Sequence, residues 1–216
     1  MGRLVAGDRI LVADDHPLIH EGIQLAIRAR YPGYHVDVAE TIAQAEQLIA
    51  RHRDYRLLLL DYMLPDSNGF SGFFRLQHAL GKVPIAIISA HGNDQIVAAS
   101  QALGAAGFLS KSRPLDEIAS AIGQLLAGKL VFPPVQASTD DIVDARNRLD
   151  LLSGAQKRVL LALAKGELNK QIAGDLGVSE ATVKAHLSAI FKKLGVTNRT
   201  QAILVIQPLL EVTERA

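Results

Sequence analysis

The stretch Arg56-Leu57-Leu58-Leu59-Leu60-Asp61 places four leucines in a row directly before an acidic residue. An apolar run without alternation is typical of a strand that is buried on both faces of a parallel sheet. A second such run, Ile85-Ala86-Ile87-Ile88, follows further along the chain. Together the two runs predict an α/β domain in which helices cover both faces of the sheet.

Apolar strand patterns alternate with amphipathic helix patterns over residues 1–128. Five strand–helix units predict a doubly wound, five-stranded parallel sheet. The expected strands are Arg9–Ala13, Tyr34–Ala39, Arg56–Leu60, Pro84–Ser89 and Ala106–Leu109, and the expected helices are 17–30, 41–53, 70–80, 93–103 and 114–127.

The helical and strand periodicity fades after this first domain. Pro133-Pro134 interrupts regular structure, and residues 137–141 are polar, which predicts a linker over 129–149 with room for a short helical turn. Four helix patterns and no strand pattern follow. Residues 150–216 are therefore expected to form a small all-α domain of four helices.

The composition of the 216 residues excludes several classes of protein. Hydrophobic residues make up 49% and charged residues 21% of the chain, which suits a buried core and argues against wholesale disorder. The absence of cysteine excludes disulfide frameworks, zinc ribbons and thiol catalysis. No apolar run approaches the ~20 residues that span a bilayer, and the first residues do not resemble a signal peptide. A cytoplasmic protein without a membrane partner is expected.

The net charge of +1 conceals a difference between the two domains. Residues 1–128 carry 11 basic and 13 acidic residues, a net charge of −2, whereas residues 150–210 carry 8 basic and 4 acidic residues, a net charge of +4. Opposite charge suggests different partners for the two halves. Offsets of this size also arise by chance, so the motifs must decide.

Five polar residues stand where the expected strands end. Asp14 and Asp15 follow the first strand, Asp61 the third, Ser89 the fourth and Lys111 the fifth. Ligands of a doubly wound sheet bind outside these ends, so the five side chains should share one cleft. One aspartate alone often only caps a helix or faces solvent. Three carboxylates, a hydroxyl and an ammonium together favour a site for Mg²⁺ and a phosphoryl group.

The segments around these residues resemble the receiver domain of two-component response regulators. The resemblance covers residues 8–128 and rests on Ala13-Asp14-Asp15-His16-Pro17-Leu18, Asp61-Tyr62-Met63-Leu64-Pro65-Asp66-Ser67-Asn68-Gly69, Ser89-Ala90 and Gly107-Phe108-Leu109-Ser110-Lys111. The Asp-Asp-His-Pro start is similar to the NarL/FixJ subfamily in particular. The resemblance implies a flavodoxin-like fold.

The resemblance also implies the parts of a phosphorylation site. Asp61 would take a phosphoryl group from a histidine kinase and form an acyl phosphate. Asp15, Asp61 and the backbone carbonyl of Met63 would hold Mg²⁺, and Asp14 would reach the ion through water. The cation would neutralise the clustered carboxylates and orient in-line transfer.

Three further receiver residues would read the phosphorylated state. Lys111 would pair with a phosphoryl oxygen, Ser89 would hydrogen-bond the phosphoryl group, and Phe108 would change its rotamer. Phe108 replaces the commoner tyrosine. Ser112 stands where many receivers have proline, which leaves open whether the Lys111–Ser112 peptide bond is cis.

Two other interpretations of the first domain are less well supported by the residues. Phosphohydrolases of the haloacid-dehalogenase type carry a second aspartate two residues after the nucleophile, and Met63 occupies that place here. His16 and His20 stand four residues apart, but no third ligand has suitable spacing, so a metal site on this pair is not expected.

The last domain contains the pattern of a helix-turn-helix. Ser153 and Gln156 have the spacing of a capping box at the start of its first helix. Further on, Gly177 follows a short amphipathic helix, and Ser179 can cap the next one. Two helices joined by a short turn with glycine make this motif.

The second helix of the motif has two distinct faces. Its apolar stripe is Val183, Leu187, Ile190 and Leu194, and its opposite stripe is Ala181, Lys184, Ala185, Ser188 and Lys192. Small residues permit close approach and lysines suit phosphates, so the second stripe fits a recognition helix in a major groove. A solvated helix face explains the same pattern equally well on periodicity alone.

A second resemblance separates these two interpretations. The segments Leu168-Asn169-Lys170-Gln171-Ile172-Ala173, Val178-Ser179-Glu180-Ala181-Thr182-Val183-Lys184-Ala185-His186 and Lys193-Leu194-Gly195-Val196-Thr197-Asn198-Arg199-Thr200 resemble the LuxR-type DNA-binding domain. It implies base contacts from Lys184, Ala185 and Ser188, and backbone contacts from Asn169, Thr182, His186 and Lys192. Gln156 departs from the glutamate usual in this family.

The two resemblances predict a phosphorylation-controlled transcription regulator that is not an enzyme. Its partners would be a sensor histidine kinase, promoter half-sites and, when phosphorylated, a second copy of the chain. The alternative is a DNA-binding regulator independent of phosphorylation, whose receiver serves only dimerisation. The complete set of Asp14, Asp15, Asp61, Ser89 and Lys111 argues against that alternative.

Overall fold

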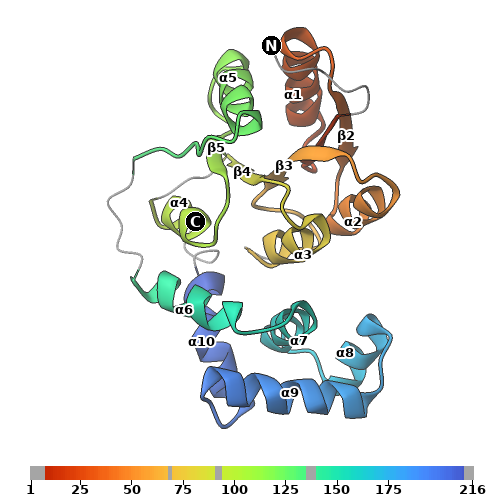
Figure 1. The fold of residues 1–216 in the computed structure, drawn as a ribbon, viewed down its shortest axis with the longest axis vertical. Helices are drawn as coiled ribbons and strands as arrows, with labels where there is room; N and C mark the ends of the chain where they lie inside the picture. The colour runs from red at the N-terminus through yellow and green to blue at the C-terminus, as the bar shows by residue number, and fades with distance from the viewer. Residues whose placement is uncertain (1–7, 68–69, 91–93, 135–139, 212–216) are drawn as a thin grey trace. The chain divides into compact units, whose positions relative to one another are not determined.

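The computed structural model describes residues 8–67, 70–90, 94–134 and 140–211. The chain forms two compact units, one containing the elements β1 to α5 and the other α6 to α10 (Figure 1). Among the described residues, no helix is long and apolar enough to cross a membrane.

The first unit is the doubly wound domain that the sequence predicts. Its five strands are parallel and lie in the order β2-β1-β3-β4-β5. The strands are β1 (Arg9–Ala13), β2 (His35–Ala39), β3 (Tyr55–Asp61), β4 (Ile85–Ser89) and β5 (Gly107–Ser110), and the helices are α1 (Pro17–Arg30), α2 (Ile42–Arg51), α3 (Ser71–Leu80), α4 (Asp94–Ala102) and α5 (Leu115–Leu126). The expected fold class is confirmed.

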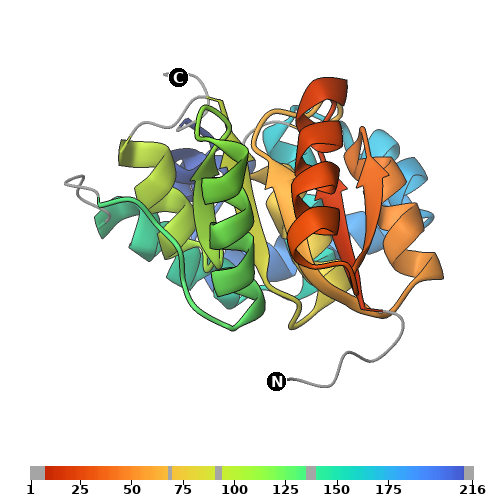
Figure 2. The same ribbon diagram turned by 90° about the horizontal axis from the view of Figure 1, so that it is seen from above.

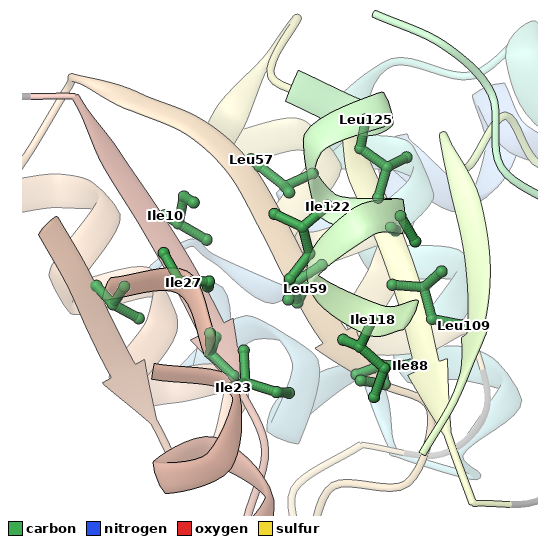
Figure 3. Packing of buried hydrophobic residues seen from close by; sticks show 14 residues of the cluster. Ile10, Ile23, Ile27, Leu57, Leu59, Ile88, Leu109, Ile118, Ile122 and Leu125 are labelled. Atoms are coloured by element: carbon green, nitrogen blue, oxygen red, sulfur yellow. The ribbon is translucent and has the colours of Figure 1, made fainter. Parts of the chain in front are cut away.

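The four leucines of β3 explain why this strand is central. Helices α1 and α5 cover one face of the sheet and α2, α3 and α4 the other (Figures 1 and 2). Leu57 and Leu59 pack with Ile23 of α1 and Ile122 of α5 (Figure 3). Successive strand side chains point to opposite faces, so Leu58 and the other buried leucine face the second helical layer. Full burial on both faces requires the unbroken apolar run.

The order of the strands fixes the position of the polar residues. The chain runs from β1 outward to β2 and then returns to β3 on the other side of β1. Ala13 at the end of β1 lies beside Leu60 of β3. The acidic residues that follow these two strands therefore meet at the same edge of the sheet, at the topological switch point.

The segment expected as a linker over 129–149 is largely structured. Val131 accepts a hydrogen bond from the Phe108 N–H (2.8 Å) and lies alongside β5, where any side chain at Gly107 would collide with it. Helix α6 (Asp140–Asp150) belongs to the second unit and packs on α10. The polar residues of α6 form an exposed face with salt bridges along the helix, such as that from Arg148 Nε to Asp144 Oδ2 (2.9 Å). The sequence predicted a linker here because α6 has too few apolar residues to show a helical pattern.

The second unit contains the four expected helices and α6. These are α7 (Gly154–Ala164), α8 (Asn169–Leu176), α9 (Glu180–Leu194) and α10 (Arg199–Glu211). The capping box of Ser153 and Gln156 is present at the start of α7. At the other end of α7, the Arg199 guanidinium donates to the carbonyls of Leu163 (3.1 Å) and Glu167 (2.9 Å).

Candidate functional site

A buried lysine joins two buried carboxylates at the carboxyl edge of the sheet. The Lys111 Nζ lies 2.7 Å from Asp14 Oδ2 and 2.7 Å from Asp61 Oδ2. The three side chains are only 5%, 0% and 3% exposed, respectively. The backbone N–H of Lys111 donates to the Ser89 carbonyl (2.8 Å), and this hydrogen bond holds the end of β5 beside the end of β4. The predicted convergence of these residues is present in the structure.

Asp61 combines a costly burial with specific partners. Burial raises the pKa of the Asp61 carboxyl above its ordinary value. Hydrogen bonds from Lys111 and from the Met63 N–H (3.2 Å) oppose this rise in pKa, whereas the neighbouring Asp14 charge adds to it. The lysine therefore favours the ionised form of a carboxylate whose burial disfavours its charge.

His16 also lies at the carboxyl ends of the strands, outside the predicted set of ligands. Its Nδ1 is 2.8 Å from Asp15 Oδ1, 3.2 Å from Asp14 Oδ1 and 3.8 Å from Asp61 Oδ2. The His16 N–H also donates to Asp14 Oδ1 (2.9 Å), which turns the chain into α1. Spacing within the sequence could not reveal the approach to Asp61, because it depends on the pairing of β1 with β3.

The donor atoms fit a divalent cation. Ligand atoms of Asp14, Asp15, His16 and Asp61 all lie within 4.8 Å of one another. The carboxylate oxygens are the hard ligands that Mg²⁺ takes in proteins. Asp15 is 33% exposed, so this edge of the cluster is open to solvent. The side chain of Met63 is half exposed, and only its backbone belongs to the predicted ligand set.

A tight turn after β3 attaches the site to two helices, through contacts that no sequence pattern predicts. The turn runs from Leu64 to Ser67, with a bond from the Ser67 N–H to the Leu64 carbonyl (3.0 Å). The Asp66 carboxylate accepts from the first two N–H groups of α2, those of Ile42 (2.8 Å) and Ala43 (3.0 Å). Ser67 Oγ accepts from the Gly72 N–H of α3 (2.8 Å). No local signal links Asp66 to a helix 24 residues earlier.

The remaining predicted receiver residues lie on the neighbouring strands β4 and β5. Ser89 is buried at the end of β4 and pairs in register with Ser110 of β5. Phe108 is buried within β5. The Lys111–Ser112 peptide bond is trans, as are the other peptide bonds of the described residues. Asn68 and Gly69, which complete the receiver motif, lie outside the described residues.

The helix-turn-helix of the second unit has the predicted turn. Gly177 ends α8 with φ of 65°, a left-handed conformation that favours glycine. Ser179 then caps α9 by accepting from the Thr182 N–H (3.1 Å). The apolar stripe of α9 faces inward, with Val183, Ile190 and the last leucine buried.

The opposite side of α9 is open to solvent. Lys184, Ala185, Ser188 and Lys192 are exposed. Ser188 Oγ donates to the Lys184 carbonyl (3.1 Å), which leaves the hydroxyl oxygen to accept from a ligand. Of the predicted backbone contacts, Thr182 is exposed, and Asn169 and His186 are half-buried. The only acidic residue of α9 is Glu180 at its first position, so cations dominate this face.

Family models match both units. The response regulator receiver domain matches residues 10–123, and the bacterial regulatory proteins of the luxR family match residues 150–206. The chain is 39% identical over 206 residues to a glycerol metabolism activator of Pseudomonas putida, covering 91% of this chain and 93% of the relative. It is 33% identical over 198 residues to a probable transcriptional regulatory protein NarL of Mycobacterium tuberculosis, covering 90% of this chain and 91% of that protein.

Solved structures show the same fold. A Salmonella typhimurium RcsB response regulator aligns with a TM-score of 0.54 and 21% identity over 94% of this chain and 99% of that chain. A structure described as two RcsB dimers bound to two parallel DNAs aligns with a TM-score of 0.53 and 20% identity over the same shares of both chains. At this identity the likeness is one of fold.

Proposed function

The chain belongs to the response regulators that join a receiver domain to a DNA-binding domain of the luxR family, and we propose that phosphorylation of Asp61 controls its binding to promoter DNA. It is a transcription regulator of the two-component type and not an enzyme. The observation that carries the proposal is the buried Asp61 carboxylate paired with Lys111 at 2.7 Å.

Asp61 acts as the nucleophile toward a phosphohistidine of the sensor kinase. An oxygen of the Asp61 carboxylate forms a bond to phosphorus as the bond from phosphorus to the histidine nitrogen breaks, which leaves an acyl phosphate. Lys111 keeps the carboxylate ionised before the transfer and afterwards pairs with a phosphoryl oxygen. Ser89, at the end of the neighbouring strand, donates its hydroxyl to the phosphoryl group.

The carboxylates of Asp15 and Asp61 and the Met63 carbonyl would hold Mg²⁺, with Asp14 reaching it through water. When bound, the ion supplies positive charge to the phosphoryl oxygens and orients the transfer. The turn at Asp66 supports this arrangement, because it attaches the segment that carries the Met63 carbonyl to the N-terminus of α2.

The exposed face of α9 would lie in the major groove. Lys184, Ala185 and Ser188 would contact base edges, and Asn169, Thr182, His186 and Lys192 would contact the backbone. Phosphorylation would favour homodimers on paired half-sites, as the RcsB dimers on DNA suggest. The phosphoryl donor would be a cognate sensor histidine kinase, in the cytoplasm.

A pair of variants at opposite ends of β3 tests the proposal. Asp61 ends this strand inside the pocket, whereas Asp54 precedes it and is 44% exposed at the other edge. The wild type and Asp54→Asn, incubated with acetyl phosphate and Mg²⁺, should gain the mass of one phosphoryl group and bind promoter DNA more tightly. Asp61→Asn should do neither.

Two results would contradict this proposal. A phosphoryl mass gain that persists in Asp61→Asn would place the acceptor elsewhere. Equal DNA affinity with and without the phosphoryl donor, in a wild type that gains the mass, would favour the regulator whose receiver serves only dimerisation.

A further inference from the structure

One nitrogen ligand stands among the oxygen ligands of the pocket. The His16 ring is 62% exposed, yet its Nδ1 approaches three carboxylates at 2.8, 3.2 and 3.8 Å. Receiver chemistry as proposed above uses only oxygen ligands and does not need this ring. His16 is thus a side chain of a metal-ligating type, close to the carboxylates of the pocket, to which the proposed function gives no role.

The separations match those of atoms that share one metal ion. Zinc and magnesium lie about 2.0–2.2 Å from their nitrogen and oxygen ligands, so neighbouring ligands are about 3.0 Å apart in an octahedral site and about 3.4 Å apart in a tetrahedral one. The three distances from His16 Nδ1 fall around these values. A single ion can therefore contact the ring and the carboxylates with little movement of the backbone.

The charge of the pocket also suits a divalent ion. Asp14, Asp15 and Asp61 contribute three negative charges, and Lys111 contributes one positive charge. With a neutral imidazole, the formal charge is −2, which one divalent cation neutralises. Imidazole nitrogen suits first-row transition ions, whereas Mg²⁺ prefers oxygen ligands alone.

We propose that His16 makes this pocket a site for a divalent first-row transition ion, held by the His16 Nδ1 together with the carboxylates of Asp15 and Asp61. The inference rests on the proposed metal site and adds a second class of ion to it. Because the transition ion uses the same carboxylates, it competes with Mg²⁺. The phosphorylation pocket thereby becomes sensitive to transition-metal supply.

The chain offers a matched control for surface histidines. His35 is 63% exposed, and its Nε2 lies 3.3 Å from Asp37 Oδ1, so ring exposure and a nearby carboxylate resemble those of His16. His35 begins β2 and therefore lies at the amino ends of the strands, whereas the pocket lies at their carboxyl ends. The His35 variant therefore measures how much any exposed histidine beside an aspartate contributes to the metal affinity of the chain.

The test titrates untagged full-length protein with Co²⁺ and separately with Mg²⁺, by calorimetry. In His16→Asn, the Co²⁺ affinity should fall at least about tenfold, because even the loss of an outer-shell partner of a metal ligand costs about 10–100-fold, while the Mg²⁺ affinity stays within about twofold. His35→Asn should match the wild type for both ions. Excess Mg²⁺ should weaken Co²⁺ binding in the wild type. Pulsed EPR of the Cu²⁺-loaded protein should show imidazole nitrogen in the wild type and in His35→Asn but not in His16→Asn.

Failure of this inference can be distinguished from failure of the proposed function. Mg²⁺ binding that persists while His16→Asn leaves Co²⁺ affinity and the nitrogen signal unchanged overturns the inference alone. An apparent Co²⁺ affinity that saturating Mg²⁺ does not lower overturns it as well, since the ions then occupy different sites. A wild type that binds neither ion refutes the metal site itself. An unchanged tyrosine fluorescence spectrum checks that each variant is folded.

Discussion

Replacement of Lys111 by methionine tests how the pocket keeps its charges. The Lys111 ammonium is the only cation within 4 Å of both Asp14 and Asp61 among the described lysine and arginine residues. Methionine keeps most of the length of the side chain and removes the charge. The variant therefore leaves two almost fully buried carboxylates next to each other without an ammonium partner.

The expected cost is large because the whole arrangement is buried. Removal of one partner from a buried ion pair destabilises a protein by about 3–5 kcal/mol, since the other charge stays buried without compensation. We expect Lys111→Met to lower the free energy of unfolding of the first unit by about this amount at pH 8 in EDTA. Lys82→Met, an exposed lysine of the same unit, should change it by less than about 0.5 kcal/mol.

The loss should depend on pH and on metal. The pKa of Asp61 is already above its ordinary value, and removal of the lysine raises it further. A carboxyl with a raised pKa in the folded state contributes most stability at low pH and loses it as pH rises through that pKa. The loss should therefore be smaller at pH 5 than at pH 8. Mg²⁺ at about 100 times its Kd adds about 2.7 kcal/mol to the free energy of unfolding of a protein that binds it only when folded. The pocket of Lys111→Met is more negative than that of the wild type, so the variant should gain at least this much stability from Mg²⁺.

The sequence supplies a specific probe for this measurement. The chain has no tryptophan, and its four tyrosines, Tyr31, Tyr34, Tyr55 and Tyr62, all belong to the first unit. Urea unfolding of the full chain followed by tyrosine fluorescence therefore reports that unit alone. An equal loss at pH 5 and pH 8, or a loss no greater than that of Lys82→Met, would refute the account of the charges.

Two further predictions concern the turn after β3 and the recognition helix. Asp66→Ala should weaken Mg²⁺ binding severalfold, because it releases the segment that carries the Met63 carbonyl. Thr41→Ala removes the other cap of α2 (3.1 Å) and should lower only the free energy of unfolding, by about 1 kcal/mol. Mg²⁺ titration and urea unfolding measure the two effects. Equal Mg²⁺ affinity in the two variants would show that the turn does not position the site. In salt-dependent binding assays, Lys192→Ala should weaken binding to all DNA and reduce the salt slope by about one unit, whereas Lys184→Ala should cost about 1–3 kcal/mol on the specific site alone. Equal losses on specific and random DNA for both would mean that α9 only contacts the DNA backbone.

Sequence predicted the first unit well because its core is built from continuous apolar runs. The pattern at Leu57–Leu60 has one economical explanation, burial on both faces, and five strands that alternate with helices over short connections leave few topologies. The same rules placed Asp14, Asp61 and Lys111 at one edge of the sheet. Burial of a strand is a property that the local sequence encodes directly.

The contacts that sequence could not predict are those between distant segments. Asp66 caps a helix that begins 24 residues earlier, and His16 approaches Asp61 across two paired strands. Either residue in isolation has the pattern of an ordinary loop or helix-start residue. Helix α6 was missed for the opposite reason, since its exposed face carries so many charges that the buried Ala145 and Leu149 do not dominate the pattern.

The buried carboxylates of the pocket are paired with a cation, and this pairing links stability to signalling. Asp14 and Asp61 are held in a buried position that disfavours their charge, and Lys111 offsets that cost by contacting both. A phosphoryl group on Asp61 adds oxygens beyond the carboxylate, so the lysine must follow the new charge or leave it unpaired. The Lys111 N–H is bonded to the Ser89 carbonyl, so any such shift acts where β4 and β5 end together. We expect the ends of these two strands to respond to phosphorylation first, because the charge that moves is attached there.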